Sequence, residues 1–228
     1  MDFPQNSHNI AGDRAEERRR MVEKQLIPYG ISNEAVLSSM LEVPRHLFVS
    51  EQLQAYAYAD CALPIDEGQT ISQPYIVALM AEALRPDPAD AVLEIGTGSG
   101  YAAAVLSRIV SKVYTIERHK NLAGQAQSRF QTLKYENIIV RIGDGSKGWT
   151  GKAPFDGILV AAGAPVIPES LGNQLKAGGC LVVPVGDRHH QELLRLEKKP
   201  DGSFDRENLG GVRFVPLVGE EGWNGNKP

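Results

Sequence analysis

The segment VLEIGTGSGYAAA constrains the fold of this chain most, because it joins a short apolar strand to a helix through a turn that contains Gly96, Gly98 and Gly100. Glycines there permit positive φ angles and let a ligand approach the backbone, where amides at the start of a helix face it. The next predicted strand, KVYTIE, ends at Glu117, about where an acidic residue accepts hydrogen bonds from ribose hydroxyls. Strand, turn, helix, strand and acid together predict a site for a ligand that contains adenosine.

From Ala91 onward, apolar strands alternate with amphipathic helices. Strands are expected at VLEI, KVYTIE, NIIVRIG and FDGILVAA, with a helix at PESLGNQL after the last of them. This alternation predicts parallel pairing and right-handed crossovers, and therefore an α/β fold with a doubly wound, mostly parallel Rossmann-like sheet covered by helices on both faces. After Gly178 and Gly179 the chain becomes β-rich, with strands expected at CLVVPVG, ELLRLEKK and VRFVPLV.

The residues before this core, from about 13 to 89, read as helices and loops. Asp13, Ser32 and Ser50 are expected to cap three helices, and the first of these should stop before Pro28. The prolines of RPDPAD then end the segment. We expect one domain over residues 1–228, with a helical part at about 13–89 and a core at about 90–218 that binds the adenosine-containing ligand.

Composition limits the partners and the compartment. The net charge of −4 and the pI near 5.8 argue against a nucleic-acid partner, since phosphate binding needs a basic face. No apolar run approaches the roughly 20 residues of a membrane span. The N-terminus lacks the pattern of a secretory signal. Cys61 and Cys180 read as reduced packing residues, so we expect a cytoplasmic protein and, further, a monomer. The five histidines show no ligand spacing, and no metal is expected.

Two details bear on the ligand. The turn has the spacing G-x-G-x-G, and Tyr101 stands where the dinucleotide fingerprint has its third glycine, so a pyrophosphate is disfavoured. Asp144 follows a strand in IGDGS, where its carboxylate could accept a hydrogen bond from an adenine amino group beside Gly145. An ordinary Asp-Gly turn would explain the same two residues.

The chain resembles a known family at several motifs. LEIGTGSGYAAA, YTIE, GDG, PFDGILVAAGAP and GGCLVVPVG stand in the order found in class I S-adenosylmethionine-dependent methyltransferases. With VPRHLFV, ALPI, GQTISQPYIVA and RFVPLV added, the sequence from roughly Met21 to Val218 is similar to the protein-L-isoaspartate O-methyltransferase family. The glycine turn alone indicates only the superfamily, whereas QTISQPY joined to a terminal RFVPL is far more specific.

The resemblance implies an activity and a set of site residues. The family methylates the α-carboxylate of L-isoaspartyl residues in damaged proteins and peptides, and the ester then collapses to a succinimide that can reopen as aspartate. S-adenosylmethionine is the implied cofactor. On this sequence the resemblance assigns the cofactor to Glu94, Gly96, Gly98, Gly100, Glu117, Asp144 and Gly145, together with Thr70 and Ile71. It assigns the substrate to Ser72, Gln73, Pro74 and Val215, with Ser72 as the expected catalytic residue.

Residue chemistry agrees with this reading. A carboxylate is already ionised at neutral pH, so its methylation needs positioning and no general base. Ser72 has two compatible interpretations: it could cap the helix that begins at SQPY, or its hydroxyl could orient the substrate carboxylate. Three alternatives stay open: another class I O-methyltransferase acting on a small molecule or a protein, an NAD-dependent oxidoreductase, and a non-catalytic module that binds the cofactor.

Overall fold

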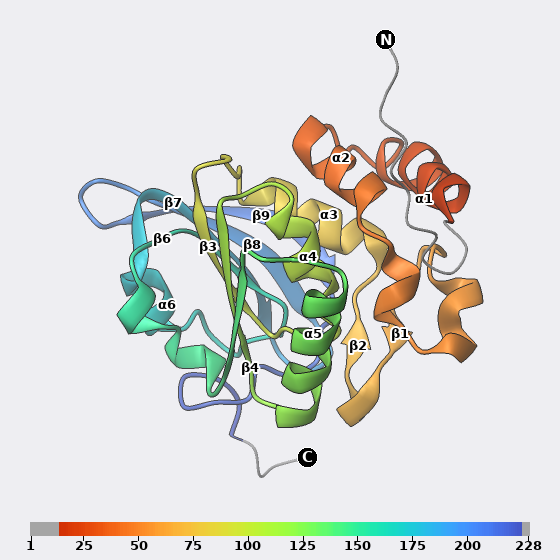
Figure 1. The fold of residues 1–228 in the computed structure, drawn as a ribbon. Helices are drawn as coiled ribbons and strands as arrows, with labels where there is room; N and C mark the ends of the chain where they lie inside the picture. The colour runs from red at the N-terminus through yellow and green to blue at the C-terminus, as the bar shows by residue number, and fades with distance from the viewer. Residues whose placement is uncertain (1–13, 225–228) are drawn as a thin grey trace.

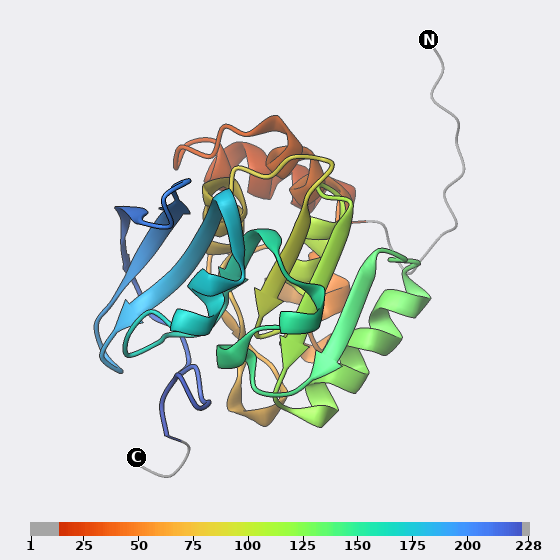
Figure 2. The same ribbon diagram turned by 90° about the vertical axis from the view of Figure 1, so that its left-hand side faces the viewer.

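The computed structural model describes residues 14–224 and contains a seven-stranded sheet of order β5-β4-β3-β6-β7-β8-β9. The strands β3 to β7 pair in parallel, while β8 and β9 are antiparallel. Figure 2 shows the sheet from β9 at its left edge to β5 at its right edge. The strands are β3 (Ala91–Ile95), β4 (Lys112–Glu117), β5 (Ile138–Ile142), β6 (Phe155–Val160), β7 (Leu175–Gly186), β8 (Gln191–Lys198) and β9 (Phe204–Val212). The predicted doubly wound fold is confirmed.

Helices cover both faces of the sheet. The helices α4 (Tyr101–Ser107) and α5 (Lys120–Thr132) lie on one side with the N-terminal helices beyond them, and α6 (Glu169–Asn173) lies on the other side (Figure 1). Successive strand residues point to opposite faces, so the interior divides in two. Val92 and Leu159 pack toward α4, whereas Leu93 and Ile158 pack with Leu171 of α6.

The N-terminal part adds short helices to the first of these cores. They are α1 (Ala15–Met21), continued by a π-helical turn at Val22–Leu26, then α2 (Glu34–Glu42) and α3 (Pro74–Ala83). The helical turns at Arg45–Phe48 and Glu51–Tyr56 are 3₁₀. The first helix stops before Pro28, as predicted, while Asp13 lies outside the described residues.

Ser32 is not a helix cap. Asn33 caps α2 instead, and its side chain accepts a hydrogen bond from the Val36 amide at 3.1 Å. The hydroxyl and amide of Ser32 bind the carboxylate of Glu82 on α3. Ser50 occupies the cap position of its 3₁₀ helix but makes no capping side-chain bond. The sequence pattern thus predicted the positions of both helices correctly. It did not predict which polar side chain binds the first free amides of each helix.

The predicted strand VRFVPLV is wrong. The antiparallel partner of β8 is β9. The pairs run from Lys198 with Phe204 to Gln191 with Val212, so β9 occupies the edge of β8 and ends before Arg213. Residues 213–218 leave the sheet edge, and Pro216 forms an isolated bridge with Gly163. Because β9 is an exposed edge, its side chains are mostly polar and give little apolar signal.

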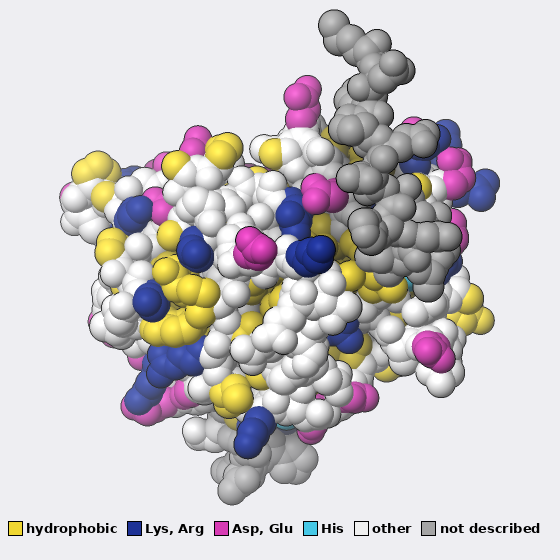
Figure 3. Space-filling view, in the orientation of Figure 1, with side chains coloured by type: hydrophobic (Ala, Val, Ile, Leu, Met, Phe, Trp, Pro, Cys, Tyr) yellow, Lys and Arg dark blue, Asp and Glu magenta, His cyan; other side chains and the backbone are white. Residues whose placement is uncertain are grey.

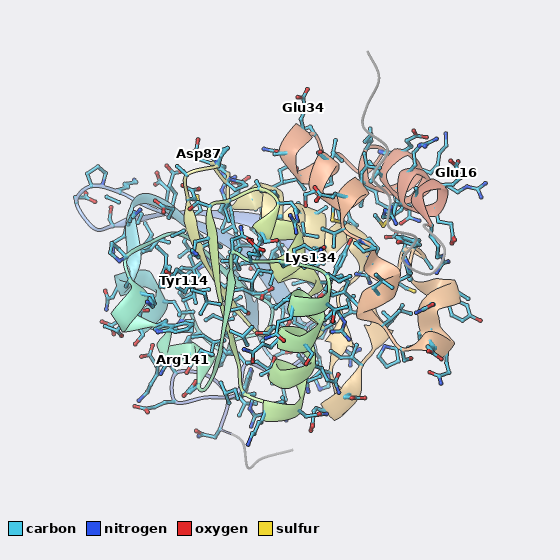
Figure 4. The ribbon with its side chains drawn as sticks, in the orientation of Figure 1. Glu16, Glu34, Asp87, Tyr114, Lys134 and Arg141 are labelled. Atoms are coloured by element: carbon cyan, nitrogen blue, oxygen red, sulfur yellow. The ribbon has the colours of Figure 1, made fainter. Side chains whose placement is uncertain are left out.

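A cluster of aromatic and basic side chains covers the outer part of β4 and β5. Tyr114 packs edge-on against Trp149 at 5.5 Å between ring centroids, and the Arg141 guanidinium lies 5.3 Å from the Trp149 ring. Tyr114 and Arg141 are labelled in Figure 4, and Figure 3 shows apolar surface flanked by Lys and Arg side chains in the same place. Short 3₁₀ turns at Gly145–Lys147 and Thr150–Lys152 connect β5 to β6 here.

Within residues 14–224, no helix combines the length and the apolar character needed to span a bilayer. Both cysteines are free thiols, but only Cys180 is buried; Cys61 is exposed and therefore not the packing residue that we expected.

Candidate active site

The glycine turn after β3 has the predicted conformation. Gly96, Gly98 and Gly100 have φ angles of +93°, +51° and +88°. The Gly100 amide donates to the Thr97 carbonyl at 2.8 Å, which closes the turn. A Cβ atom on Gly100 would lie 2.7 Å from the Phe130 ring, so this glycine is required for the packing of α4 against α5. Gly96 and Gly98 line the cavity beside the turn, whereas Gly100 does not.

Glu117 connects the end of β4 to the same turn. Its Oε2 accepts a hydrogen bond from the Gly98 amide at 2.9 Å, and its Oε1 accepts from the His119 amide at 2.9 Å. The side chain is 5% exposed and lines the cavity. Each carboxylate oxygen has a second lone pair, so the pair can still accept hydrogen bonds from a diol.

Glu94 is fully buried within β3 and also lines the cavity. Its Oε2 accepts from the Thr115 hydroxyl at 2.5 Å, while Oε1 has no hydrogen bond among the described residues. Burial raises the pKa of Glu94 to about 8 and the charge of Glu117 adds to the rise, while the Thr115 hydroxyl and the nearby Ala103 backbone act to lower it. A buried carboxyl oxygen without a partner fits a cationic donor from a ligand.

The strip between residues 70 and 73 forms another wall. Thr70 and Ile71 make the short strand β2, which pairs with β1 (Leu63–Pro64). The helix α3 then begins at Pro74, and Gln73 is its N-cap residue without a side-chain cap. Ser72 is therefore not the cap, which corrects one of its two interpretations. The Gln73 side chain donates to Asp60 at 2.7 Å.

Two cavities meet at this strip. The first contains the glycine turn and both buried glutamates, and the second opens between α3 and the β7–β8 turn, near Asp187 and Arg213. Thr70 and Ser72 line both cavities. Ligands in the two cavities would therefore both lie against Thr70 and Ser72.

The segment after β9 forms another wall of the first cavity. The Val215 carbonyl accepts from the Gly163 amide, and the Leu217 amide donates to the Gly163 carbonyl, both at 2.8 Å. The buried side chain of Gln191 accepts from the Phe214 amide at 2.8 Å. These bonds hold Val215 against the first cavity. Part of the RFVPL motif thus reaches the site as irregular backbone.

The Asp144 carboxylate faces the C-terminal segment. It accepts bonds from the Ser146 amide at 2.9 Å and from the Glu220 amide at 2.8 Å. Burial acts to raise the pKa of Asp144, but the Glu220 amide and the Ser146 hydroxyl and amide outweigh it and lower that pKa. Gly145 lines the first cavity and Asp144 does not. A Cβ atom on Gly145 would collide with the Ile95 side chain.

The structure thus brings most of the predicted site residues together. The first cavity is lined by Thr70, Ile71, Ser72, Glu94, Gly96, Gly98, Glu117, Gly145 and Val215. Gln73 lines the second cavity. Gly100, Asp144 and Pro74 line neither, and Pro74 is buried in the first turn of α3.

Several lining residues were not predicted. Arg118 and His119 follow Glu117, and Ala161 and Ala162 follow β6 at the same edge of the sheet. Their signal was available, because residues after parallel strands meet at one edge and form the ligand crevice of such folds. Tyr101 also lines the cavity from the first turn of α4. Across residues 14–224, no group of three or more His, Cys, Asp and Glu side chains is arranged to hold a metal ion.

Comparisons with known proteins agree with this geometry. A family model described as protein-L-isoaspartate(D-aspartate) O-methyltransferase matches residues 16–222. A protein-L-isoaspartate O-methyltransferase of Pelotomaculum thermopropionicum is 66% identical over 212 residues, which are 93% of each chain. One of Petrotoga mobilis is 54% identical over 92% of this chain and 100% of its own.

Solved structures give the same result. One titled as a protein-L-isoaspartate O-methyltransferase is 31% identical, with a TM-score of 0.82 over 90% of this chain and 67% of that chain. Another, from Plasmodium falciparum, carries S-adenosyl-L-homocysteine and is described as a putative protein-L-isoaspartate O-methyltransferase. It is 26% identical, with a TM-score of 0.75 over 88% of this chain and 98% of that one. The chain belongs to the protein-L-isoaspartate O-methyltransferase family.

Proposed function

We propose that this site transfers the methyl group of S-adenosylmethionine to the free α-carboxylate of L-isoaspartyl residues in proteins and peptides. The observation that carries the proposal is the meeting of two cavities at Thr70 and Ser72. One cavity has the glycine turn and the buried acids that suit an adenosine-containing cation. The other is an open groove that suits a peptide. Family membership supports both assignments.

The residues of the first cavity fit S-adenosylmethionine, which, when bound, supplies an electrophilic methyl group. Glu117 would hold the ribose hydroxyls with its remaining lone pairs. The unpartnered Oε1 of Glu94 would accept from the ammonium of the methionine part. Gly96 and Gly98 would let the ligand approach the backbone, and Gly145 would lie beside the adenine. We propose that Asp144 also contacts the adenine. For this role its carboxylate must turn away from the Glu220 amide, which donates to it.

On the substrate side, we assign Ser72, Gln73 and Val215 to the isoaspartyl segment. The Ser72 hydroxyl and the nearby amides would orient the carboxylate, and Thr70 and Ile71 would separate it from the cofactor. Pro74 fixes the start of α3 behind them. Because the carboxylate is ionised at neutral pH, these residues need to position it and exclude water, with no proton to remove.

We also propose how the chain is organised. The residues before about 90 supply the substrate side, those from about 90 to 218 hold the cofactor, and the two parts share one core. We also propose that the protein acts as a monomer. Both cysteines are free thiols, as in proteins of the cytoplasm.

The proposal is tested by incubating the protein with a labelled methyl donor and two peptides. The peptides differ only in an L-isoaspartyl or a normal aspartyl residue. We expect base-labile label on the isoaspartyl peptide alone. Equal labelling of both peptides, or of neither, would contradict the proposed substrate.

A further inference from the structure

Arg45 is a fully buried arginine that lies directly behind residues 70–73, the strip that lines both cavities. It is 0% exposed and belongs to the VPRHLFV motif, whose role the proposed function does not explain. Its Nε donates to the Ala57 carbonyl at 2.8 Å, and its Nη2 donates to the Ser72 carbonyl at 2.7 Å. The guanidinium therefore holds two backbone segments that are far apart in the sequence, and one of them is the strip itself.

The same guanidinium contacts the cofactor side. Its Cζ lies 4.7 Å from the ring centroid of Tyr101, the first residue of α4, which lines the first cavity. Tyr101 is 1% exposed, and its ring packs against Phe48 at 5.5 Å between centroids. Arg45 thus bridges the substrate strip and the helix that follows the glycine turn.

The charge of Arg45 has no acidic partner among the described residues. Its Nε and Nη2 donate to neutral carbonyl groups, and its buried Nη1 has no hydrogen-bond partner among residues 14–224. Burial lowers the pKa of Arg45, and the groups that oppose this effect are Tyr101, Cys61 and Tyr58, with no carboxylate among them. Arginine stays protonated in proteins, and a buried charge is normally paired. A positive charge left unpaired one residue behind a cavity wall attracts an anion to that wall.

We propose that Arg45 is the positioning residue of the substrate side, and that its unpaired charge makes the site select a carboxylate over a neutral group of the same shape. By holding the Ser72 carbonyl it fixes the strip on which the carboxylate lies. This inference rests on the proposed function, because that function supplies the anion. Arginine suits the task better than lysine, since its planar fork reaches two carbonyl groups in fixed directions.

The test uses two variants and a matched control. Arg45→Met removes the charge and both hydrogen bonds, while Arg45→Lys keeps the charge but cannot hold both carbonyl groups. The control is Arg108→Met, because Arg108 also stacks on a tyrosine, Tyr135, at 4.2 Å and lines neither cavity. Each variant is characterised by its melting temperature, by calorimetry with S-adenosylhomocysteine, and by kinetics with an isoaspartyl peptide.

A further measurement separates positioning from mere stability. With S-adenosylhomocysteine present, calorimetry compares the isoaspartyl peptide with the same peptide carrying isoasparagine, whose carboxamide is neutral. For Arg45→Met we expect the preference for the carboxylate to vanish, kcat/KM to fall ~100-fold, and the Kd for S-adenosylhomocysteine to change less than ~3-fold. Arg45→Lys should keep the preference but lose about tenfold in kcat. Arg108→Met should match the unsubstituted protein in its carboxylate preference, in kcat/KM and in the Kd for S-adenosylhomocysteine.

Either of two variants can overturn the inference. One is a folded Arg45→Met protein, if it keeps its carboxylate preference or if it loses S-adenosylhomocysteine and the peptide equally, as expected for a purely structural residue. The other is Arg45→Lys, if it has wild-type kcat, a result that decides the question even where Arg45→Met does not fold. An unsubstituted protein that binds but never methylates the isoaspartyl peptide would count against the proposed function instead.

Discussion

The carboxylate of Glu117 holds the amide of Gly98 at 2.9 Å. The end of β4 thereby fixes the turn that follows β3, and the same side chain remains open to a ligand in the first cavity. A substitution of Glu117 will therefore act on the ligand and on the conformation of the turn together.

For Glu117→Ala we expect a loss of about 1.5–3 kcal/mol in the binding of S-adenosylhomocysteine, the range for a hydrogen bond to a charged group. Titration calorimetry on the folded variant measures it. Glu192→Ala is a suitable control, because Glu192 is a carboxylate that lines only the second cavity. Unchanged affinity in Glu117→Ala would remove Glu117 from the ribose site.

Gly98 and Gly100 should separate ligand binding from folding. A Cβ atom on Gly98 would meet only Ile65, at 3.6 Å, whereas one on Gly100 would collide with the Phe130 ring. Gly98→Val should therefore retain much of the fold, although its φ of +51° adds strain. It should abolish cofactor binding, because Gly98 lines the first cavity and its new side chain would crowd the ligand. Gly100→Ala should lower the free energy of unfolding by about 1–3 kcal/mol through overpacking. Thermal melts and calorimetry on both proteins would show this division, and a reversed pattern would contradict it.

Ser72→Asp tests the role of the Ser72 hydroxyl. Because Gln73 is the N-cap residue of α3, Ser72 contributes no cap, and the melting temperature should change little. We expect kcat/KM for the isoaspartyl peptide to fall ~100-fold or more, from lost orientation and from repulsion between two carboxylates. Ser50→Asp, away from both cavities, controls for the added charge. Normal methylation by Ser72→Asp would exclude a substrate role for the hydroxyl.

Glu94 should make the stability of the ligand-free protein depend on pH. Its pKa is about 8 in the folded state and near 4.5 in the unfolded state. Between these values the folded protein binds more protons, so this contribution is fully present below about pH 4.5 and is lost as the pH rises through 8. Urea unfolding measures the free energy of unfolding of the wild type and of Glu94→Gln from pH 5 to 9. Relative to Glu94→Gln, the free energy of unfolding of the wild type should fall by up to about 4 kcal/mol between pH 5 and pH 9. Parallel pH profiles would contradict the shift.

The strands of the core were predictable because each is a short apolar run bounded by a turn. KVYTIE coincides with β4, and VLEI lies within β3. The apolar signal failed at β9, where an exposed edge strand needs no apolar side chains and VRFVPLV owes its apolar character to a cavity wall. Periodicity reports burial and does not report which element causes it.

The cap residues and the contacts behind the site show a second limit. Ser32 and Ser72 each stand one residue before the actual cap position, a difference that depends on local φ and ψ angles. The bonds from Arg45 to Ser72 and from Gln191 to Phe214 join residues that are distant in sequence, and a single sequence carries no signal for such pairs. The sequence therefore predicted the site residues at the strand ends. It did not predict the residues behind them, such as Arg45 and Gln191, that hold the site backbone in place.

The wall formed by Val215 to Val218 has a consequence for synthesis of the protein. A ribosome makes the chain from its N-terminus, so the glycine turn, both glutamates and the Ser72 strip are complete before this wall exists. The bonds of Asp144 to Glu220 and of Ser146 to Glu221 come later still. A nascent or truncated chain that ends before Val215 can therefore have most of its core and still lack this wall of the first cavity.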